Sequence, residues 1–193
     1  MRVLLIHAHP VEESFSAALK NEALRVLAAA GHSVEECDLY ARGFDPVLSR
    51  EERLAYHDVE HNREPVADYV EQLMRAEAIV LVYPVWNFGF PAILKGYFDR
   101  VFLPGVSFRM REGKVVPNLR HIRRLVAVTT YGGSRLRACL VGDPPRKLVR
   151  RVLRALIAPT GRLSYLALYD MNRIDEAGRK AFVARVTAEL ERL

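Results

Sequence analysis

The sequence predicts an α/β fold in which a five-stranded parallel sheet carries helices on both faces. Short apolar segments of strand length alternate with longer segments of helical period, and most connections between them are short. The strand segments at 2–7 and 78–83 are nearly continuous apolar runs, which is typical of strands buried on both faces of a parallel sheet, whereas the segment at 33–39 carries acidic residues on alternate positions. We expect residues 1–193 to form a single domain.

The first half of the chain supplies two of the strands and two long helices. The apolar run RVLLIH ends in a turn at His9-Pro10, and from Ser16 the apolar residues follow the period of an amphipathic helix, with Gly31 as its left-handed cap. The expected elements are a strand at 2–7, a helix from Ser16 to about Ala30, a strand at 33–39, a polar excursion at about 41–64 with a short helix near 50–55, and a helix around 66–74, whose apolar stripe is Val66, Val70, Leu73 and Met74.

The second half repeats the alternation three times. Proline at position 91 suits the first turn of a helix, and Asp143 and Asp175 are typical helix N-caps. The expected elements are a strand at 78–83, an aromatic loop at 84–90, a helix at 91–102, a strand at 124–129, a helix from 144 to about 158, a strand at 163–169 and a closing helix after Asp175.

Right-handed connections between these elements favour the flavodoxin-like strand order 2-1-3-4-5. In such sheets, ligands bind beyond the carboxyl ends of the strands, around the switch point between strands 1 and 3. The loops that follow each strand are therefore the expected site of function.

Composition excludes several classes of protein. The chain has 29 Lys and Arg against 23 Asp and Glu, a net charge of +6, but the cations are spread evenly and the densest cluster, at 146–154, has the spacing of a solvated helix face. We therefore expect no nucleic-acid partner. No apolar run is long enough to span a membrane, and the 2 cysteines form no disulfide framework, so we expect a cytoplasmic protein.

Three neighbouring strand ends carry residues suited to a ligand. Ser14 and Ser16 place hydroxyl groups at a helix N-terminus, where an anion is favoured; plain N-capping is the alternative. The aromatic loop at 83–91 suits a flat heteroaromatic ligand, or else forms a satellite of the core. The glycine pair at 132–133 allows backbone N–H groups to approach a ligand, or forms a tight turn.

Two matches to metal-binding motifs are not expected to bind metal. HDVEH at 57–61 spells an inverted zinc-protease signature, but it lies in the polar excursion and not on a stable amphipathic helix. His7 and His9 share one strand face without an acidic or cysteine partner nearby in sequence. We predict no metal site, and no motif indicates a hydrolytic nucleophile.

The segment YPVWNFGFPAILKGYFDRVF, at 83–102, closely resembles the signature segment of the NAD(P)H:quinone oxidoreductase (DT-diaphorase-like) family of flavodoxin-like flavoproteins. Weaker matches lie at 7–16, 38–49 and 129–133, and the last third of the chain matches only in its βα pattern. The resemblance implies a homodimer whose flavin pockets are each completed by the partner. It also implies ping-pong reduction, in which NAD(P)H reduces the flavin before the acceptor enters the same slot.

The resemblance also implies roles for individual residues. His9, Ser14, Phe15 and Ser16 would hold the flavin phosphate; Pro84, Val85, Trp86, Asn87 and Phe88 would lie along the isoalloxazine; and Thr129, Thr130, Tyr131, Gly132 and Gly133 would meet its pyrimidine edge. Hydride addition at flavin N5 leaves negative charge near N1 and O2, where preorganised N–H donors lower the barrier.

The sequence departs from the family in the segment after the glycine pair. The family's quinone reductases place a Tyr and a His there as proton-transfer partners, whereas this chain has SRLRAC at 134–139. The catalytic group is therefore unassigned, with Tyr131 and Arg135 as candidates. The family's long C-terminal extension has no counterpart here, so both FAD and FMN stay open as the cofactor.

The function predicted from the sequence is NAD(P)H-dependent, flavin-mediated, two-electron reduction of quinones or similar acceptors. One alternative is a flavodoxin-type electron carrier, although carriers of that type are usually strongly acidic and this chain has a charge of +6. The other is a regulatory flavoprotein, similar to the ancillary subunits of glutathione-gated potassium efflux systems.

Overall fold

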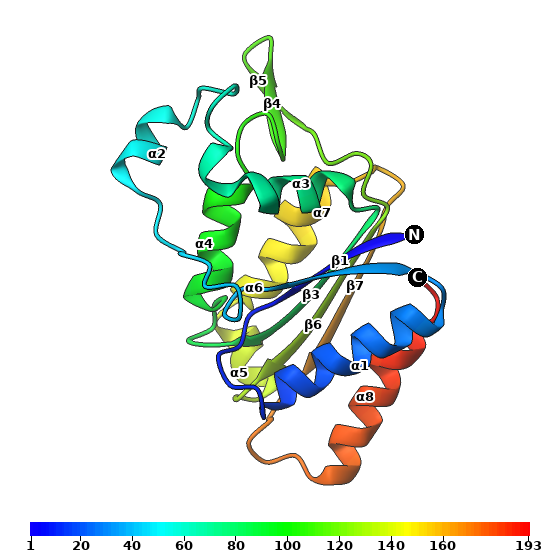
Figure 1. Ribbon diagram of the computed structural model, residues 1–193. Helices are drawn as coiled ribbons and strands as arrows, with labels where there is room; N and C mark the ends of the chain where they lie inside the picture. The colour runs from blue at the N-terminus through cyan, green and yellow to red at the C-terminus, as the bar shows by residue number, and fades with distance from the viewer.

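The computed structural model describes all residues, 1–193. Its centre is a five-stranded sheet whose neighbouring strands are all parallel (Figure 1). In spatial order the strands are β2 (Ser33–Asp38), β1 (Arg2–His7), β3 (Ala78–Val85), β6 (Arg124–Tyr131) and β7 (Arg162–Leu168). This arrangement confirms the predicted order, since β6 and β7 are the fourth and fifth strands of the sheet.

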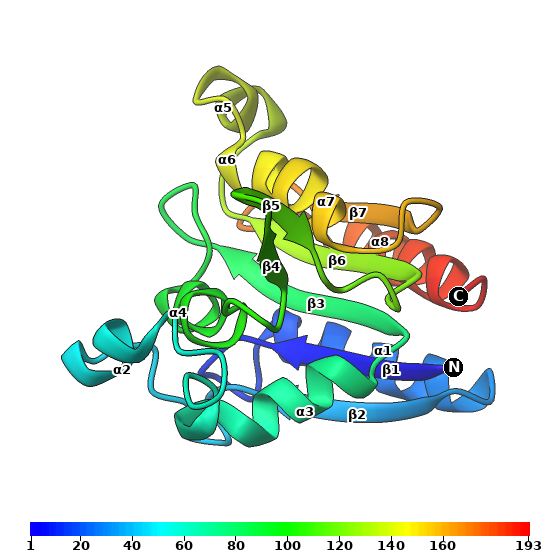
Figure 2. The same ribbon diagram turned by 90° about the horizontal axis from the view of Figure 1, so that it is seen from above.

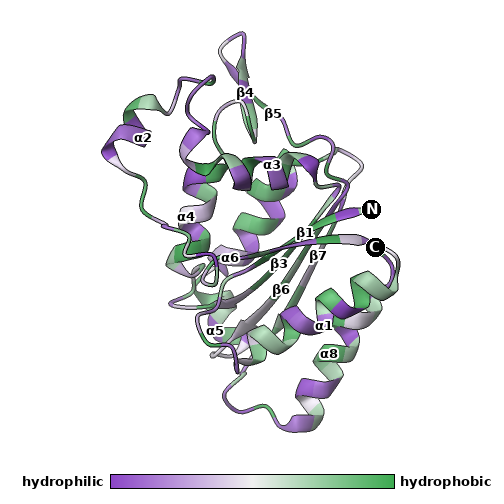
Figure 3. Ribbon diagram, viewed as in Figure 1, coloured by the Kyte–Doolittle hydropathy of each residue, from purple (hydrophilic) through white to green (hydrophobic).

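Helices cover both faces of the sheet, as Figures 1 and 2 show. Each helical layer encloses its own apolar cluster against the strands, and Figure 3 shows hydrophobic residues along the central strands β1 and β3. One layer is α1 (Phe15–Ala29) with α8 (Glu176–Leu190); the other contains α3 (Ala67–Arg75), α4 (Ala92–Val101), α6 (Pro144–Lys147), a π-helical stretch (Leu148–Leu153) and α7 (Arg154–Leu156). Every helix is too short or too polar to cross a bilayer.

The predicted starts of α1 and α8 are confirmed, and in each a nearby side chain caps the helix. Ser14 accepts a hydrogen bond from the Ala17 N–H at the start of α1, and Asp175 accepts one from the Gly178 N–H at the start of α8. Gly31 follows α1 with a φ of 77°, the left-handed conformation that glycine adopts without a steric cost.

The excursion between β2 and α3 is polar, as predicted, but it is anchored to the rest of the molecule. It contains α2 (Arg50–Ala55) and a 3-10 turn (Glu64–Val66). Glu52 of α2 forms an ion pair with Arg100 of α4 at 2.6 Å, and Phe44 is buried. The Asn62 side chain donates to the carbonyls of Tyr56 and Pro104, which ties the excursion to the segment after α4.

A hairpin and a short helix were not predicted. A hairpin of β4 (Phe108–Arg111) and β5 (Lys114–Pro117) projects beyond the sheet, closed by Glu112 and Gly113, both at positive φ (Figure 1). The short helix is α5 (Arg135–Leu140), which follows β6. Each strand of the hairpin has 4 residues and α5 has 6, and segments this short do not show a clear hydrophobic period in the sequence.

Three expectations about side chains were wrong. Asp143 precedes α6 but does not cap it: its φ is 46° and its carboxylate instead pairs with Arg146 at 3.0 Å. Arg146 is consequently not part of the predicted solvated stripe. Met74, expected on the buried stripe of α3, is 39% exposed, because that stripe is completed by Val66, Val70 and Leu73.

Candidate functional site

A cavity of about 380 Å³ opens at the carboxyl ends of β1, β3 and β6, the position predicted from the topology. Loops that follow four of the five strands contribute to its wall, so residues far apart in the sequence meet there. The lining residues are His9, Ser14, Phe15, Ser16, Pro84, Val85, Trp86, Thr130, Gly132, Met171 and Asn172.

One end of the cavity, called here the anion end, presents the N-terminus of α1 and two serine hydroxyls. Ser14 caps α1, and Ser16 is the second residue of the helix. Because no helical turn precedes them, the first backbone N–H groups of α1 lack intrahelical acceptors. The positive end of the helix dipole adds to this field. Phe15, between the two serines, supplies an apolar wall beside the hydroxyl groups.

The aromatic wall of the cavity ends in a strained turn. Trp86 and Gly89 exchange two backbone hydrogen bonds of 3.2 and 2.8 Å, so Asn87 and Phe88 are the central residues of a tight two-residue turn. Their φ angles are 47° and 56°. Asparagine adopts this left-handed conformation with little strain, whereas phenylalanine adopts it only at an energetic cost. Glycine is the usual residue at the second position of such a turn. Strain of this kind is concentrated at functional sites.

The third wall is the turn after β6. The backbone N–H groups of Gly132 and Gly133 donate to no group of the protein, which leaves them free for a ligand. A Cβ added to Gly132 would lie 3.3 Å from the side-chain nitrogen of Asn172, tighter than an ordinary contact. Met171 and Asn172 enter from the loop after β7, held by a hydrogen bond from the Met171 N–H to the Tyr131 carbonyl.

The structure brings most of the sequence-predicted site residues together. Nine of them line the cavity, whereas Asn87, Phe88, Thr129, Tyr131 and Gly133 do not. Thr129 is fully buried within β6. Met171 and Asn172 were missed by sequence reasoning, which did not consider the loop after the last strand. The rule that ligands bind beyond the carboxyl ends of parallel strands could have found them.

Tyr131 points away from the cavity into a cluster of tyrosines. Its hydroxyl donates to Asp143 Oδ1 at 2.7 Å and lies 2.6 Å from the hydroxyl of Tyr165, and its ring packs on Tyr169 with centroids 4.5 Å apart. Burial raises the pKa of Tyr165 to about 12, so this cluster is neutral at physiological pH. The other candidate, Arg135, is exposed at the start of α5.

Arg135 borders a second cavity of about 310 Å³ that lies on the tyrosine side of the glycine turn. Its lining also includes Lys147, Tyr169 and the ion pair between Asp143 and Arg146. A wider groove of about 560 Å³ runs between α1 and α8, away from the strand ends. The structure therefore places Arg135 near the glycine turn but outside the cavity at the switch point.

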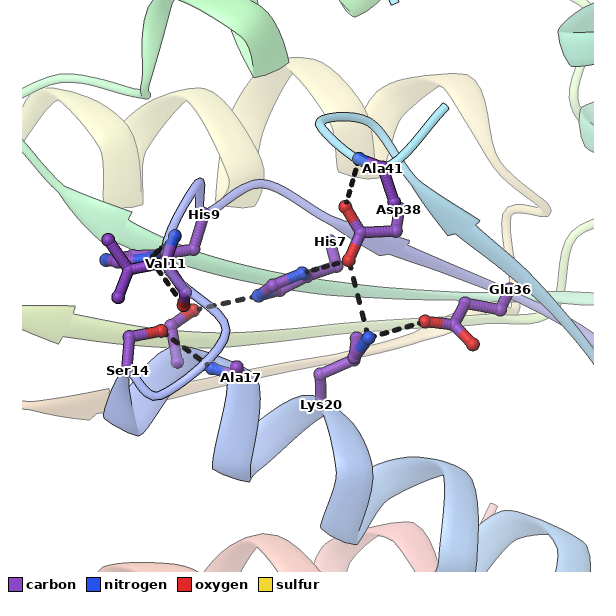
Figure 4. Close-up of polar contacts among 10 residues, drawn as sticks. His7, His9, Val11, Ser14, Ala17, Lys20, Glu36, Asp38 and Ala41 are labelled. Carbon is purple, nitrogen blue, oxygen red and sulfur yellow. Dashed lines mark hydrogen bonds and ion pairs between the residues drawn. The ribbon is translucent and has the colours of Figure 1, made fainter. Parts of the chain in front are cut away.

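Behind the anion end of the cavity lies a chain of polar groups that runs from the buried His7 and Ser16 to the exposed Glu36 (Figure 4). His7 Nδ1 lies 2.8 Å from Asp38 Oδ2, and His7 Nε2 lies 3.4 Å from Ser16 Oγ. Lys20 contacts the same Asp38 oxygen at 3.3 Å and Glu36 at 2.7 Å. Burial lowers the pKa of His7 below its ordinary value, although the Asp38 carboxylate opposes this. Burial acts to raise the pKa of Asp38, but hydrogen bonds from His7 and the Ala41 N–H outweigh burial, so the pKa of this carboxyl lies below its ordinary value.

The geometry agrees with a comparison of the sequence with known families. Residues 1–190 match the family described as having a flavodoxin-like fold. The chain belongs to this family. The match includes every strand of the sheet and each loop that lines the cavity at the switch point.

Individual relatives are oxidoreductases by name. The chain is 30% identical over 95% of its length to an uncharacterized NAD(P)H oxidoreductase of Haemophilus influenzae, covering 91% of that protein. It is 32% identical over 69% of its length to rat NAD(P)H dehydrogenase [quinone] 1, of which it spans 54%. The structure of an NAD(P)H:quinone oxidoreductase from Methanothermobacter marburgensis superposes with a TM-score of 0.82 at 26% identity, covering 99% of this chain and 98% of that one.

Proposed function

We propose that this protein is a flavin-dependent NAD(P)H oxidoreductase that reduces quinones or similar acceptors by two electrons. The observation that carries the proposal is the combination, in one cavity, of a helix N-terminus that carries two serine hydroxyls, an aromatic wall and the free backbone amide of Gly132. A flavin nucleotide has the same sequence of chemical groups: a phosphate, a flat ring system and a polar ring edge. The names of the relatives support the same activity.

The residues present fit a flavin nucleotide. Ser14, Ser16 and the first N–H groups of α1 would hold the phosphate. Trp86 would lie along the ring system, with its 41% exposed side chain covered by the cofactor. Gly132 and Gly133 would donate their free N–H groups to the pyrimidine edge. A Cβ at Gly132 would crowd the side chain of Asn172, which lines the same cavity.

A bound flavin would supply the group that accepts hydride from NAD(P)H and passes it to the acceptor. The chain's own part is to bind and orient the ring and to stabilise negative charge at its polar edge with preorganised donors. The amides of Gly132 and Gly133 are suited to this role. Of the two candidate catalytic side chains, Tyr131 directs its hydroxyl to Asp143 and Tyr165, away from the cavity. Arg135 can contribute only as a fixed positive charge, because a guanidinium does not act as an acid in proteins.

We also propose a two-fold homodimer. Large apolar side chains are exposed on both the excursion and the cavity rim: Leu54 is 70% exposed, Val47 66% and Phe88 38%. A strained, exposed Phe88 beside a half-open cavity is consistent with a partner that completes the pocket. The interface is expected to bury more than about 1,000 Å². A monomeric mass in light scattering of the flavin-loaded protein would refute this.

The first experiment is an absorbance spectrum of the purified protein, followed by mass spectrometry of the released cofactor, which distinguishes FAD from FMN. Steady-state oxidation of NADH and of NADPH, each with menadione, then tests the activity. Parallel double-reciprocal lines are expected for ping-pong kinetics. Failure to bind flavin refutes the proposal; flavin binding without NAD(P)H oxidation favours the electron carrier.

A matched pair of variants tests Arg135. If its charge stabilises the reduced ring, Arg135→Ala lowers the limiting rate of flavin reduction in stopped flow by about 10- to 1,000-fold, the range for loss of one preorganised donor. Arg150→Ala, a change of another exposed arginine that lies outside both cavities, serves as the control. An unchanged limiting rate with weaker apparent affinity for NADPH alone assigns Arg135 to the 2′-phosphate.

A further inference from the structure

His7 is a buried titratable group that the proposed reaction does not use. It is the last residue of β1 and is only 1% exposed, so it cannot touch a ligand directly. Its ring nevertheless joins the carboxylate of Asp38 to the hydroxyl of Ser16, and Ser16 lines the anion end of the cavity. The chain of contacts therefore links a protonation site to the cavity through one hydroxyl group.

We propose that His7 is a positioning residue for the flavin phosphate, and that its protonation decides whether the Ser16 hydroxyl donates toward the cavity or away from it. This inference rests on the proposed function, since it takes the anion to be the phosphate of a flavin nucleotide. According to this inference, His7 takes up a proton from solvent when the flavin phosphate binds.

The direction of the hydrogen bonds follows from the donor inventory. The Asp38 carboxylate only accepts, so His7 Nδ1 carries a hydrogen and donates it. In the neutral ring, Nε2 is then an acceptor, and the Ser16 hydroxyl donates to it, which turns oxygen lone pairs toward the cavity. In the protonated ring, Nε2 donates to Ser16 Oγ, and the hydroxyl hydrogen is free to bond to a phosphate oxygen.

The surroundings of His7 allow both states. From β2, Asp38 and Glu36 contribute negative charge, and from α1, Lys20 contributes positive charge; His9 is the other titratable neighbour. On the β3 side, the residue paired with His7 in the sheet register is the apolar Val82. The two carboxylates and the one ammonium leave a net charge of about −1 beside the ring, which favours the imidazolium, whereas burial favours the neutral ring. An anion in the cavity that accepts from Ser16 shifts this balance toward the imidazolium.

The sign of the effect is fixed by linkage. Burial holds the pKa of His7 below its ordinary value in the free protein. An anion that accepts from Ser16 favours the imidazolium and raises that pKa, so binding takes up protons. Affinity for the phosphate-bearing cofactor therefore rises as the pH falls through the His7 titration, by up to about tenfold for each unit by which binding moves the pKa.

The test measures proton uptake together with affinity. The flavin-free protein is titrated calorimetrically with FMN, and separately with riboflavin, near pH 7 in two buffers with different heats of ionisation. Uptake of a fraction of a proton is expected with FMN and none with riboflavin, which lacks the phosphate. Because a phosphate monoester with a pKa near about 6 releases protons when it binds as the dianion, uptake cannot come from FMN itself.

Two substitutions separate protonation from packing. His7→Gln places an amide near the Nε2 position and does not titrate; His7→Asn keeps a donor near Nδ1 for Asp38 but leaves Ser16 without its partner. Both should abolish the proton uptake, and His7→Asn should weaken FMN binding by about tenfold near pH 6 while riboflavin binding changes less than twofold. His121→Gln, near the opposite ends of the strands, is the control and should behave as the wild type.

Equal proton uptake in the His7→Gln protein, or none in the wild type with FMN, would overturn the inference. If neither substituted protein folds, Ser16→Ala, which removes the hydroxyl that His7 contacts, takes their place: it should show no proton uptake with FMN, and uptake equal to the wild type would overturn the inference. FAD, whose diphosphate does not titrate near neutrality, provides a second phosphate probe. If none of the three flavins binds, the proposed function itself fails, which is a distinct result.

Discussion

The rings of His9 and Trp86 meet edge to face, with centroids 5.7 Å apart and planes inclined at 61°. These two residues come from different strand ends, the first after β1 and the second after β3, and both line the cavity at the switch point. His9 is itself held by a hydrogen bond from the Val11 N–H to its Nδ1 at 3.0 Å. The contact therefore orients the indole from a fixed neighbour, at the mouth of the site.

Trp86→Ala should weaken flavin binding. An aromatic contact contributes about 1 kcal/mol beyond its buried area, so the dissociation constant for FMN should rise at least about fivefold. Flavin fluorescence quenching measures this. Tyr40→Ala removes another exposed aromatic ring, outside the cavity, and should leave the constant unchanged. Full flavin retention by the Trp86→Ala protein after extensive dialysis would place the indole away from the ring.

Phe88→Gly should stabilise the protein and impair its activity. The left-handed conformation at position 88, with a φ of 56°, costs a non-glycine residue about 1 kcal/mol, which glycine avoids. Urea unfolding should show that gain, while NAD(P)H oxidation falls because the exposed ring is lost. Phe88→Ala removes the ring but keeps the strain, so it should lose activity without the gain in stability. Equal stability of the two variants would argue against strain at this turn.

Tyr131→Phe should affect stability and not flavin chemistry. The change removes a hydroxyl that bonds to Asp143 and Tyr165, at a cost of about 1–2 kcal/mol in the free energy of unfolding. Because the hydroxyl faces away from the cavity, the limiting rate of flavin reduction in stopped flow should change less than twofold. A tenfold slower rate would instead establish Tyr131 as a catalytic residue.

The flavin-free protein should lose stability as the pH falls through the His7 titration. Burial depresses the pKa of His7 in the folded state, so its stabilising contribution is present above the unfolded value of about 6.5 and is lost on acidification. Urea unfolding between about pH 7.5 and about 5.5 measures the slope. The slope should be smaller in His7→Gln. Identical slopes would mean that other groups, such as Asp38, account for the acid sensitivity.

Gly96→Ala should destabilise the fold although it improves helix propensity. A Cβ at this position of α4 would overlap the backbone carbonyl oxygen and Cα of Pro46. Because backbone atoms cannot rotate aside, we expect a loss of about 1–3 kcal/mol in the free energy of unfolding. Gly89→Ala is the control, since its Cβ would meet its nearest neighbour at an ordinary 3.6 Å. An unchanged midpoint for Gly96→Ala would show that the excursion can move away from α4.

The amino-acid sequence by itself determined the architecture of this protein. Continuous apolar strands and amphipathic helices encode which elements form, and the constraints on parallel sheets then fix their order and the end at which ligands bind. Ser14, Asp175 and Gly31 were predictable for the same reason, because each acts on backbone groups within three residues of itself or on its own backbone. Interactions between residues close in sequence can be predicted from a short stretch of that sequence.

Tertiary structure alone decided the features that depend on pairing across the chain. His7 and Asp38 are separated by 31 positions and Tyr131 and Tyr165 by 34, and nothing in either local pattern specifies the partner. Asp143 has the sequence of an N-cap, yet its carboxylate accepts hydrogen bonds from the hydroxyl groups of Tyr131 and Tyr169, which lie 12 and 26 positions away and reach it only once the sheet has formed. A polar side chain takes the strongest partner that the folded chain presents, and only the packing of distant elements determines which one that is.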